Sequence, residues 1–253
     1  MATQLSKNQV DRLGDRLREG HITEADLRLL DQYRRAFSEA YEGVVEAIRN
    51  ELGLEPTGRP AKSTTSISDK LRRESIRLSQ IQDIAGCRLI VADIAAQDLV
   101  VQSLASLFEH PTVGDRREKP SHGYRAVHVI VNAHDRLIEI QVRTALQHLW
   151  AELSEKCSDI VDPAVKYGGG DKDIREILDE TSFLVAEQER LETRAANLAA
   201  QVDSEDESDE SKKQVLIDVK VKLRKLRQNL VQNLRDSMEF VEKLKGEGDD
   251  ISD

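Results

Sequence analysis

The chain has 253 residues, 39% of them hydrophobic and 33% charged, which is enough for one sizeable core with appended helices or for two small domains. A formal net charge of −10 argues against a general nucleic-acid coat protein, and no apolar run is long enough to span a bilayer. The polar N-terminal residues lack the apolar stretch of a signal peptide, so we expect a cytoplasmic protein.

Charge is unevenly distributed along the sequence. The stretch "DSEDESDE" at 203–210 is strongly acidic, whereas "KLRR" at 70–73 and "RREK" at 116–119 make the middle of the chain locally basic. The middle is therefore compatible with an anionic ligand despite the net charge. The two cysteines, Cys87 and Cys157, lie in apolar segments, and we expect them to be buried free thiols.

The first fifty residues read as helices. Residues 3–19 form an amphipathic pattern that ends at Gly20, and Thr23 followed by Asp26 resembles a capping box. From there, apolar residues recur at spacings of three and four as far as Leu52, which predicts one long helix.

The middle of the chain mixes strands with helices. The Gly, Pro, Ser and Thr content of 53–66 predicts a loop. The elements expected next are a short helix at 67–76, a strand at 87–92, a helix at 95–109, two strands joined by a tight turn within 121–144, and a helix that begins after Thr144. This order predicts an α+β fold, with a small mixed β-sheet flanked by helices.

The last third of the chain reads as helix alone, in runs at 172–202 and 211–245 on either side of the acidic insert 203–210. We expect a helical hairpin that packs on itself, on the N-terminal helices or on a second subunit. The sequence thus divides into N-terminal helices, a central core and a C-terminal helical region, with the ranges 1–52, 53–165 and 166–253.

The two strands within 121–144 can be read as faces, because side chains on a strand reverse direction at every residue. One face is aliphatic, and the other gathers ionisable and polar groups. The polar face holds Tyr124, His128, Glu139, Gln141 and Arg143. Together with the charged segments around it, this pattern indicates a binding site.

The neighbouring segments suit a phosphorylated ligand. Asp83 and Glu139 are two separated carboxylates that fit a Mg²⁺ site, because this ion takes oxygen ligands and often uses only one or two carboxylates with substrate phosphates. Clustered Lys and Arg suit polyphosphate, and Tyr124 offers a stacking surface. A metal, a triphosphate and a second nucleotide imply phosphoryl-type transfer, although the sequence has no P-loop and no kinase-type glycine motif.

Three motifs carry a family resemblance. "IQDIAGCRLIV", "GYRAVHVIV" and "IEIQVRTALQHLWAEL" resemble the synthetase domain of the RelA/SpoT family in its short single-domain form, over roughly residues 40–165. The resemblance implies a nucleotidyltransferase-like mixed sheet. It also implies an enzyme that moves the β,γ-pyrophosphate of ATP to the ribose 3′-OH of GDP or GTP, which makes the guanosine tetra- or pentaphosphate alarmone of the stringent response.

The same resemblance assigns roles to residues. Asp83 would hold Mg²⁺, and Glu139 would share this ion and act as general base on the 3′-OH. The ATP-binding residues would be Arg59, Lys62, Ser66, Lys70, Arg73 and Arg88, with Arg88 and Arg59 stacked on the adenine. The acceptor-binding residues would be Lys119, His122, Tyr124, His128 and Gln141. Arg143 and His148 would orient Glu139 or tie the sheet to the next helix.

Two departures from the family pattern leave the acceptor open. The ATP loop reads Arg59-Pro-Ala-Lys62 in place of Arg-x-Lys, and the acceptor loop lacks the lysine after Pro120 and the asparagine before Gly123. A toxin branch of the family pyrophosphorylates the 3′ end of tRNA, and the basic residues at 116–119 could meet tRNA phosphates. An adenine nucleotide acceptor and a catalytically silent nucleotide sensor are further alternatives. The C-terminal helices would serve a homo-oligomer or an antitoxin.

Overall fold

The computed structural model describes residues 5–59, 61–204 and 210–249, and the chain divides into two compact units. The first consists of Met1–Leu89, Val100–Gly114 and Val127–Val142, and the second of Ile90–Leu99, Asp115–Ala126 and Arg143–Asp253. The segment limits expected after residues 52 and 165 stay a prediction. Among the described residues, no helix combines the length and the apolarity that crossing a membrane requires.

Three helices open the first unit. Helix α1 (Lys7–Glu19) ends at Gly20, whose left-handed backbone forms the C-cap. Helix α2 (Glu24–Arg35) begins at the expected capping box, in which Thr23 and Asp26 satisfy each other's backbone N–H groups. The predicted end of the first helix and the predicted capping box are confirmed, but the helix begins at Lys7 and not at residue 3, because the Ser6 side chain caps it there.

The prediction of one long helix after Thr23 is wrong, because the helix is interrupted before α3 (Ser38–Leu52). The Phe37 N–H donates to the Arg34 carbonyl at 2.9 Å, three residues back instead of four, so the turn is tightened there. The tightened turn accompanies burial of the Phe37 ring, which packs edge-on against Tyr33 with the ring centroids 5.3 Å apart.

Part of the expected loop at 53–66 is also regular structure. Residues Thr57–Arg59 form strand β1, and helix α4 (Thr64–Arg73) starts three residues earlier than expected. The Ser63 hydroxyl explains the early start, since it accepts a hydrogen bond from the Ser66 N–H at 3.2 Å and caps the helix. A 3₁₀ turn, η1 (Leu78–Gln80), then leads to the sheet.

The sheet has five strands in the order β1-β2-β5-β4-β3. The strands after β1 are β2 (Ala85–Val91), β3 (Thr112–Asp115), β4 (Val127–Ala133) and β5 (Arg136–Thr144). The sequence predicts only three of the five. The edge strands β1 and β3 are three and four residues long, and β3 is exposed throughout, so neither shows a hydrophobic alternation. The helix after β2 is α5 (Ile94–Leu107).

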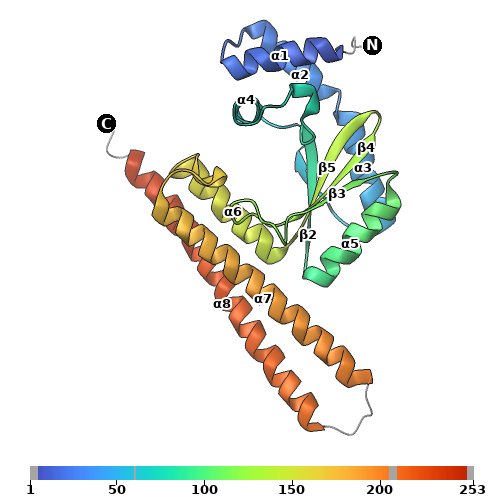
Figure 1. The fold of residues 1–253 in the computed structure, drawn as a ribbon, viewed down its shortest axis with the longest axis vertical. Coiled ribbons are helices and arrows are strands. Elements are labelled where there is room, and N and C mark those ends of the chain that lie inside the picture. Colours follow the sequence, from blue (N-terminus) through green and yellow to red (C-terminus); the bar gives the residue numbers. More distant parts are fainter. Residues whose placement is uncertain (1–4, 60, 205–209, 250–253) are drawn as a thin grey trace. The chain divides into compact units, whose positions relative to one another are not determined.

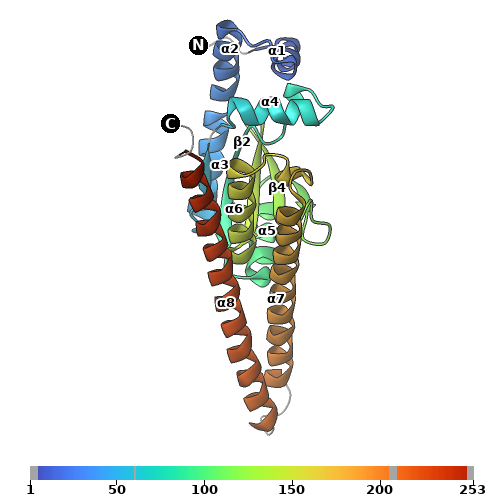
Figure 2. The same ribbon diagram turned by 90° about the vertical axis from the view of Figure 1, so that its left-hand side faces the viewer.

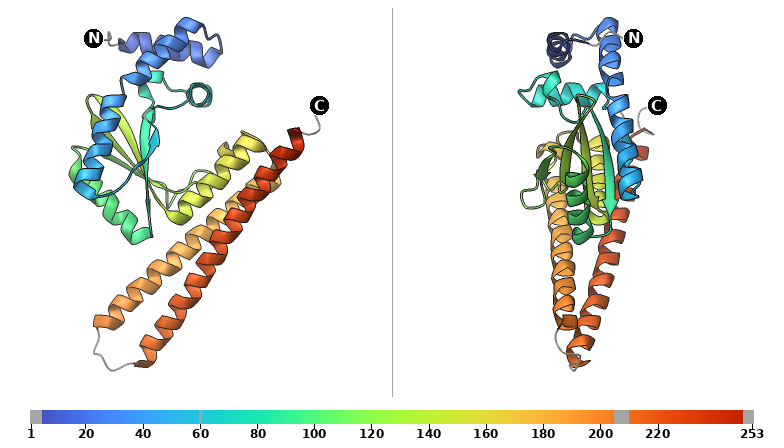
Figure 3. Two further views of the ribbon diagram at one scale, coloured as in Figure 1. Left: turned by 180° about the vertical axis from the view of Figure 1, so that it is seen from behind. Right: turned by 90° about the vertical axis from the view of Figure 1, so that its right-hand side faces the viewer.

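Strands β4 and β5 form the expected antiparallel hairpin, joined at His134 and Asp135, which both have positive φ. Their register places aliphatic residues opposite one another on one face. The pairs are Val127 with Val142, Val129 with Ile140 and Val131 with Ile138, and all six side chains are buried. The aliphatic face is confirmed, and helix α3 packs against β4 (Figure 1 and Figure 3).

The second unit is mostly helical. Helix α6 (Ala145–Ile160), the turn η2 (Val165–Tyr167) and the two long antiparallel helices α7 (Lys172–Ser204) and α8 (Glu210–Asp249) share one hydrophobic core (Figure 2). Trp150 lies in this core, and its indole N–H donates to the Leu178 carbonyl at 2.9 Å. The expected hairpin packs on itself and on α6. Most of the acidic insert, 205–209, lies outside the described residues.

The Asp26 carboxylate should make the first unit sensitive to acid. Hydrogen bonds from Arg16 and Thr23 lower its pKa from 3.8 to about 2, so the folded state binds this proton more weakly than the unfolded chain. Its stabilising contribution is present above the unfolded pKa and is lost as the pH falls toward 2. We expect Asp26→Asn to lower the free energy of unfolding by about 1–2 kcal/mol at pH 7, and by roughly half as much at pH 3. Urea unfolding across this range checks the prediction, and a loss that does not change with pH would contradict it.

Candidate active site

Asp83 lies in the first unit between two lysines. The Lys70 ammonium contacts Asp83 Oδ1 at 2.9 Å, and the Lys62 ammonium contacts Asp83 Oδ2. Burial alone would raise the pKa of Asp83, but the charges and hydrogen bonds of the two lysines hold it below its ordinary value. Asp83 is therefore an ionised carboxylate at neutral pH. The sequence assigned Lys62 and Lys70 to ATP phosphates, and the structure brings both to the predicted metal ligand.

Glu139 points from β5 onto the polar face of the sheet, where two side chains hold its carboxylate. His128 Nδ1 lies 2.9 Å from Oε1, and Gln141 Nε2 donates to Oε2 at 2.7 Å. His128 is opposite Gln141 in the β4–β5 register and diagonal to Glu139, which puts the three on one face as expected. Burial would raise the pKa of Glu139, but the hydrogen bond and charge of His128, with the bond from Gln141, lower it below its ordinary value.

Gly86 allows the strands of the site to approach each other closely. A Cβ atom at position 86 would lie 2.6 Å from the Glu139 carbonyl oxygen, which is closer than real Cβ atoms come. The glycine of "DIAGCR" is thus required where β2 passes the backbone of Glu139. Two residues separate it from Asp83, so one close approach brings both carboxylate-bearing segments together.

Asp83 and Glu139 are suited to a divalent metal ion that takes its remaining ligands from a substrate. Within the described part of the chain, no three metal-ligating side chains gather at one point. Asp83 and Glu139 are both ionised, and the negative charge of Asp83 opposes the ionisation of Glu139. A hard cation between them would relieve this repulsion, with substrate phosphates completing its oxygen ligands. The residues present therefore fit Mg²⁺.

The other predicted ATP-binding residues lie in β1, α4 and β2, the elements that precede and follow Asp83 in the sequence. Ser66 lies in the first turn of α4, where its hydroxyl accepts from Ser63 at 2.7 Å, and Arg73 lies at the end of that helix beside Glu74. Arg88 shares a face of β2 with Gly86, since the strand alternates. Arg59 ends β1 in register with Gly86, and its side chain lies outside the described part of the structure.

The predicted acceptor segment belongs to the second unit. Ser121–Tyr124 form a tight turn in which His122 and Gly123 both have positive φ. His122 thus adopts the left-handed conformation that asparagine favours, so the turn persists without the asparagine of the family pattern. The Tyr124 hydroxyl accepts from the Arg143 guanidinium at 2.9 Å, and this cation lies over the ring at 4.9 Å. Lys119 is exposed.

The two remaining polar residues have different surroundings. Buried Arg143 orients Tyr124, a role that the sequence did not suggest. His148 lies one turn before Glu152 on α6, with Nε2 3.5 Å from its carboxylate. Of these two residues, Arg143 is the one that contacts the predicted acceptor segment, through the hydroxyl and ring of Tyr124.

Helix α7 contributes two side chains that sequence reasoning missed. The Ser182 hydroxyl donates to the Gly123 carbonyl at 2.6 Å and accepts from Arg125 at 3.3 Å, which fixes the turn before Tyr124. Buried Glu189 accepts from the Thr144 hydroxyl and from Gln147 Nε2, at the point where the E-x-Q-x-R-T motif enters α6. Ser182 and Glu189 alternate with buried Leu178 and Val185 on one helical stripe. Polar residues on an otherwise apolar stripe were the available signal.

The thiol of Cys87 is buried in β2, close to the segment that carries Asp83. Burial, with the nearby charge of Glu139, raises the pKa of Cys87 to about 12. Cys157 is buried in the core of the second unit, and both cysteines are free. The expectation of buried free thiols is confirmed.

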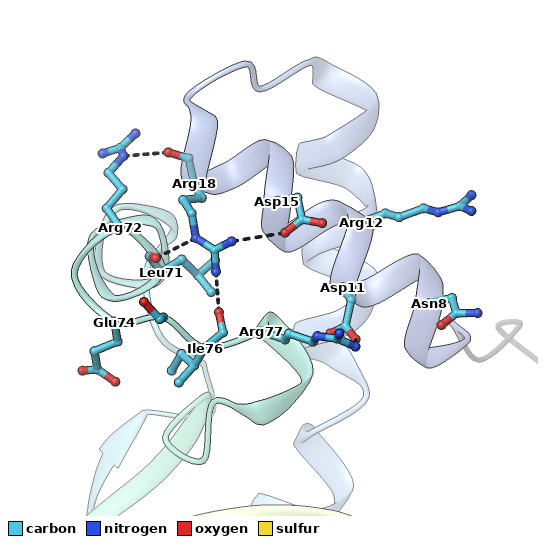
Figure 4. Close-up of a pocket in the computed structure, with 11 residues that line it drawn as sticks. Asn8, Asp11, Arg12, Asp15, Arg18, Leu71, Arg72, Glu74, Ile76 and Arg77 are labelled. Carbon is cyan, nitrogen blue, oxygen red and sulfur yellow. Dashed lines mark hydrogen bonds and ion pairs between the residues drawn. The ribbon is translucent and has the colours of Figure 1, made fainter.

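A separate groove of about 720 Å³ lies in the first unit between α1 and the segment after α4 (Figure 4). Arg18 spans it, donating to the Leu71 carbonyl at 2.8 Å and to the Ile76 carbonyl, with Asp15 at 3.2 Å. None of the predicted site residues lines it. These contacts attach α1 to the end of α4, the helix that carries Lys70.

Comparison with known proteins matches this site to a family. Residues 58–158, which include Asp83 and Glu139, match the model of a region found in RelA/SpoT proteins. Residues 58–158 thus form a RelA/SpoT region, which is less than half of the chain. An uncharacterized protein of Mycobacterium tuberculosis is 33% identical over 170 residues, which cover 64% of this chain and 62% of that protein. The chain therefore spans less than two thirds of this relative's length.

Solved structures agree with the RelA/SpoT assignment. The small alarmone synthetase 1 of Bacillus subtilis has a TM-score of 0.53 at 25% identity, over 72% of this chain and all of that one. The same protein bound to its product pppGpp has a TM-score of 0.50 at 23% identity over the same shares. The predicted family and the predicted α+β fold are confirmed. The matched region ends before α7, so Ser182 and Glu189 lie outside it.

Gly86→Ala should disrupt the RelA/SpoT domain at its centre. The added methyl group would collide with the Glu139 carbonyl, so strand separation is expected to lower the free energy of unfolding by about 1–3 kcal/mol. The matched control is Gly43→Ala in α3, where a Cβ has an ordinary contact 3.7 Å from His134 and alanine favours the helix. Denaturant unfolding of both variants checks the prediction, and equal stability would contradict it.

Glu189→Ala should destabilise the second unit, because Thr144 and Gln147 lose a buried acceptor. We expect a loss of about 1–3 kcal/mol in the free energy of unfolding. Glu187→Ala is the matched control, since Glu187 contacts Arg190 near the surface of the same helix and its loss should change little. Thermal and urea unfolding measure both variants. A Glu189 variant as stable as the Glu187 variant would show that the network contributes nothing.

Proposed function

We propose that this chain is a Mg²⁺-dependent pyrophosphotransferase that moves the β,γ-pyrophosphate of ATP to the 3′-OH of GDP or GTP. The observation that carries the proposal is the pair of ionised carboxylates, Asp83 just before β2 and Glu139 on the polar face of β5, each held by its own hydrogen-bond donors. The likeness of the fold to a small alarmone synthetase supports the choice of reaction.

On the donor side, Lys62 and Lys70 are placed to bind phosphates. Without a nucleotide they neutralise Asp83, and polyphosphate oxygens offer them stronger partners. Asp83 and Glu139 would hold Mg²⁺, which when bound neutralises charge on the transferred phosphates. Ser66 and the N-terminus of α4 add hydrogen-bond donors to the same segment.

On the acceptor side, Glu139 is placed to receive the 3′-hydroxyl proton. The 3′-oxygen bonds to the β-phosphorus, the bond from this phosphorus to the oxygen bridging the α-phosphate breaks, and AMP leaves. His128 and Gln141 fix the direction of the Glu139 carboxylate while each oxygen keeps a free lone pair. Because its pKa is low, Glu139 is a weak base, and most of the acceleration must come from positioning.

Tyr124 is the residue that we assign to the acceptor base. The guanidinium of Arg143 lies over one side of the ring and binds its hydroxyl, so the ring plane is set before a nucleotide arrives. A preset ring loses little conformational freedom when a base stacks on it.

The charge of the acceptor segment favours a free nucleotide over tRNA. Arg117, which could have met tRNA phosphates, binds Asp98 and Asp115 at 2.6 Å each. Its charge is thus already neutralised, and only Arg116 and Lys119 of the basic run are exposed without such a pair of carboxylates. A weak basic patch gives little of the electrostatic attraction that RNA binding requires.

Transfer of labelled phosphate tests the proposal. The protein is incubated with γ-labelled ATP and Mg²⁺, and separately with GDP, GTP, an adenine nucleotide or deacylated tRNA. We expect label on GDP or GTP, and a rate at least about 100-fold lower for Glu139→Gln and Asp83→Asn. Asp135→Asn, in the exposed β4–β5 turn, is the matched control and should keep the wild-type rate.

Three other results of this assay would contradict the proposal or part of it. Label on tRNA alone would replace the proposed acceptor and assign a translation-blocking enzyme. No transfer by wild type to any acceptor, with circular dichroism indicating a folded protein, would refute the enzymatic proposal. Full activity in Glu139→Gln would refute the role given to that carboxylate.

A further inference from the structure

Helix α7 presents a row of aliphatic side chains to solvent at a strict seven-residue spacing. The row consists of Ile177, Leu184, Leu191 and Leu198, whose side chains are between 38% and 53% exposed. Isolated exposed leucines are ordinary on protein surfaces, but four in a heptad series are not. A strict seven-residue repeat is the spacing with which one helix packs along another.

Helix α8 carries a second row with the same repeat. Val219, Leu226 and Phe240 are between 38% and 62% exposed, and the intermediate heptad position is the exposed amide Asn233. A single polar residue in such a row fixes register and the number of helices that associate.

The two rows lie level with each other. Gln188 Nε2 donates to the Leu223 carbonyl at 2.9 Å, and Arg227 contacts Glu192 at 2.6 Å, so the two contacts together place the part of α7 around residue 190 level, to within a helical turn, with the part of α8 around residue 225. Because the helices are antiparallel, a step of seven residues toward the C-terminus of α7 corresponds to a step of seven residues toward the N-terminus of α8. The resulting levels pair Ile177 with Phe240, Leu184 with Asn233, Leu191 with Leu226, and Leu198 with Val219.

The rows also lie on the same side of the hairpin. Leu184 directly precedes buried Val185, and Asn233 directly precedes buried Leu234. In an antiparallel pair of helices, the residue that directly precedes a buried residue points to the same side of the pair on both helices. The two rows together form one surface, which we name the apolar seam.

We propose that the apolar seam binds the apolar seam of a second copy of this chain, so that two α7–α8 hairpins form a four-helix bundle. A two-fold contact requires a surface complementary to itself, and the charges on α7 have this property. The heptad position beside the row is acidic at Asp173, Glu180 and Glu187 and basic at Arg194, and Arg190 is paired with Glu187 on the same helix.

Charge sets the orientation of the two copies. If the two α7 helices run antiparallel about a two-fold axis between Glu187 and Gln188, Leu184 of one copy meets Leu191 of the other. The same axis brings Glu180 close to Arg194 of the other copy, and the two-fold symmetry makes this pair twice. A parallel arrangement would instead oppose like charges.

Sedimentation velocity on the full chain tests the proposal. We expect wild type to sediment as a dimer at micromolar concentration, and Leu191→Glu to dissociate with an affinity at least tenfold weaker. Phe183→Glu is the matched control, because Phe183 is 60% exposed on α7 but is turned away from the row. It adds the same charge to the same helix and should leave the dimer intact.

Three results would overturn the proposal: a monomeric wild type, a dimeric Leu191→Glu variant, or equal dissociation of both variants. Since the substituted side chains are exposed, unchanged circular dichroism melting would separate lost association from misfolding. The sedimentation result does not depend on catalysis, so it can fail while the proposed function stands.

Disulfide cross-linking tests the orientation. An antiparallel seam predicts that a mixture of Leu184→Cys and Leu191→Cys proteins forms a covalent dimer, whereas neither variant alone does so efficiently. The native cysteines are buried and should not compete. Cross-linking of each variant alone would refute the antiparallel arrangement.

Discussion

Two carboxylates of like charge, Asp83 just before β2 and Glu139 on β5, stay ionised within electrostatic reach of each other in the first unit. Desolvation opposes both charges, so each needs compensating partners within hydrogen-bond distance. Asp83 has two ammonium groups, and Glu139 has an imidazole and an amide. The partners differ in kind, because two long lysine side chains hold Asp83, whereas the donors of Glu139 come from neighbouring strand positions of β4 and β5.

The scaffold explains why those partners are where they are. Lys70 lies on α4, and Arg18 attaches the end of this helix to α1. The backbone N–H of Lys62 donates to the Ile84 carbonyl at 2.7 Å, which holds Lys62 beside the residues that lead into β2. The donors of Glu139 come from the β4–β5 ladder, whose register is set by the buried aliphatic pairs on the opposite face. A slip of one residue would turn every polar group of the site into the core, so packing on one face protects the chemistry on the other.

The sequence was most informative where periodicity and motif coincide. The alternation of β4 and β5 was enough to place His128, Glu139 and Gln141 on one face, and the family motifs identified Asp83 as their partner. Strands β1 and β3 were missed because short exposed edges have no periodic signal. The break at Phe37 was missed because the apolar spacing continues through it. Ser182 and Glu189 were missed because polar residues in a long amphipathic helix look like solvent-exposed ones until a partner is known.

The position of Glu189 means that the RelA/SpoT domain of this chain is not a free-standing module. Its matched region stops in α6, yet the hydroxyl that caps α6, the indole of Trp150 and the carbonyl of Gly123 all find their partners on α7. A chain ended at that boundary would leave these groups unsatisfied and expose the core of the second unit to water. The RelA/SpoT region and its C-terminal hairpin should therefore be expressed and engineered as one piece.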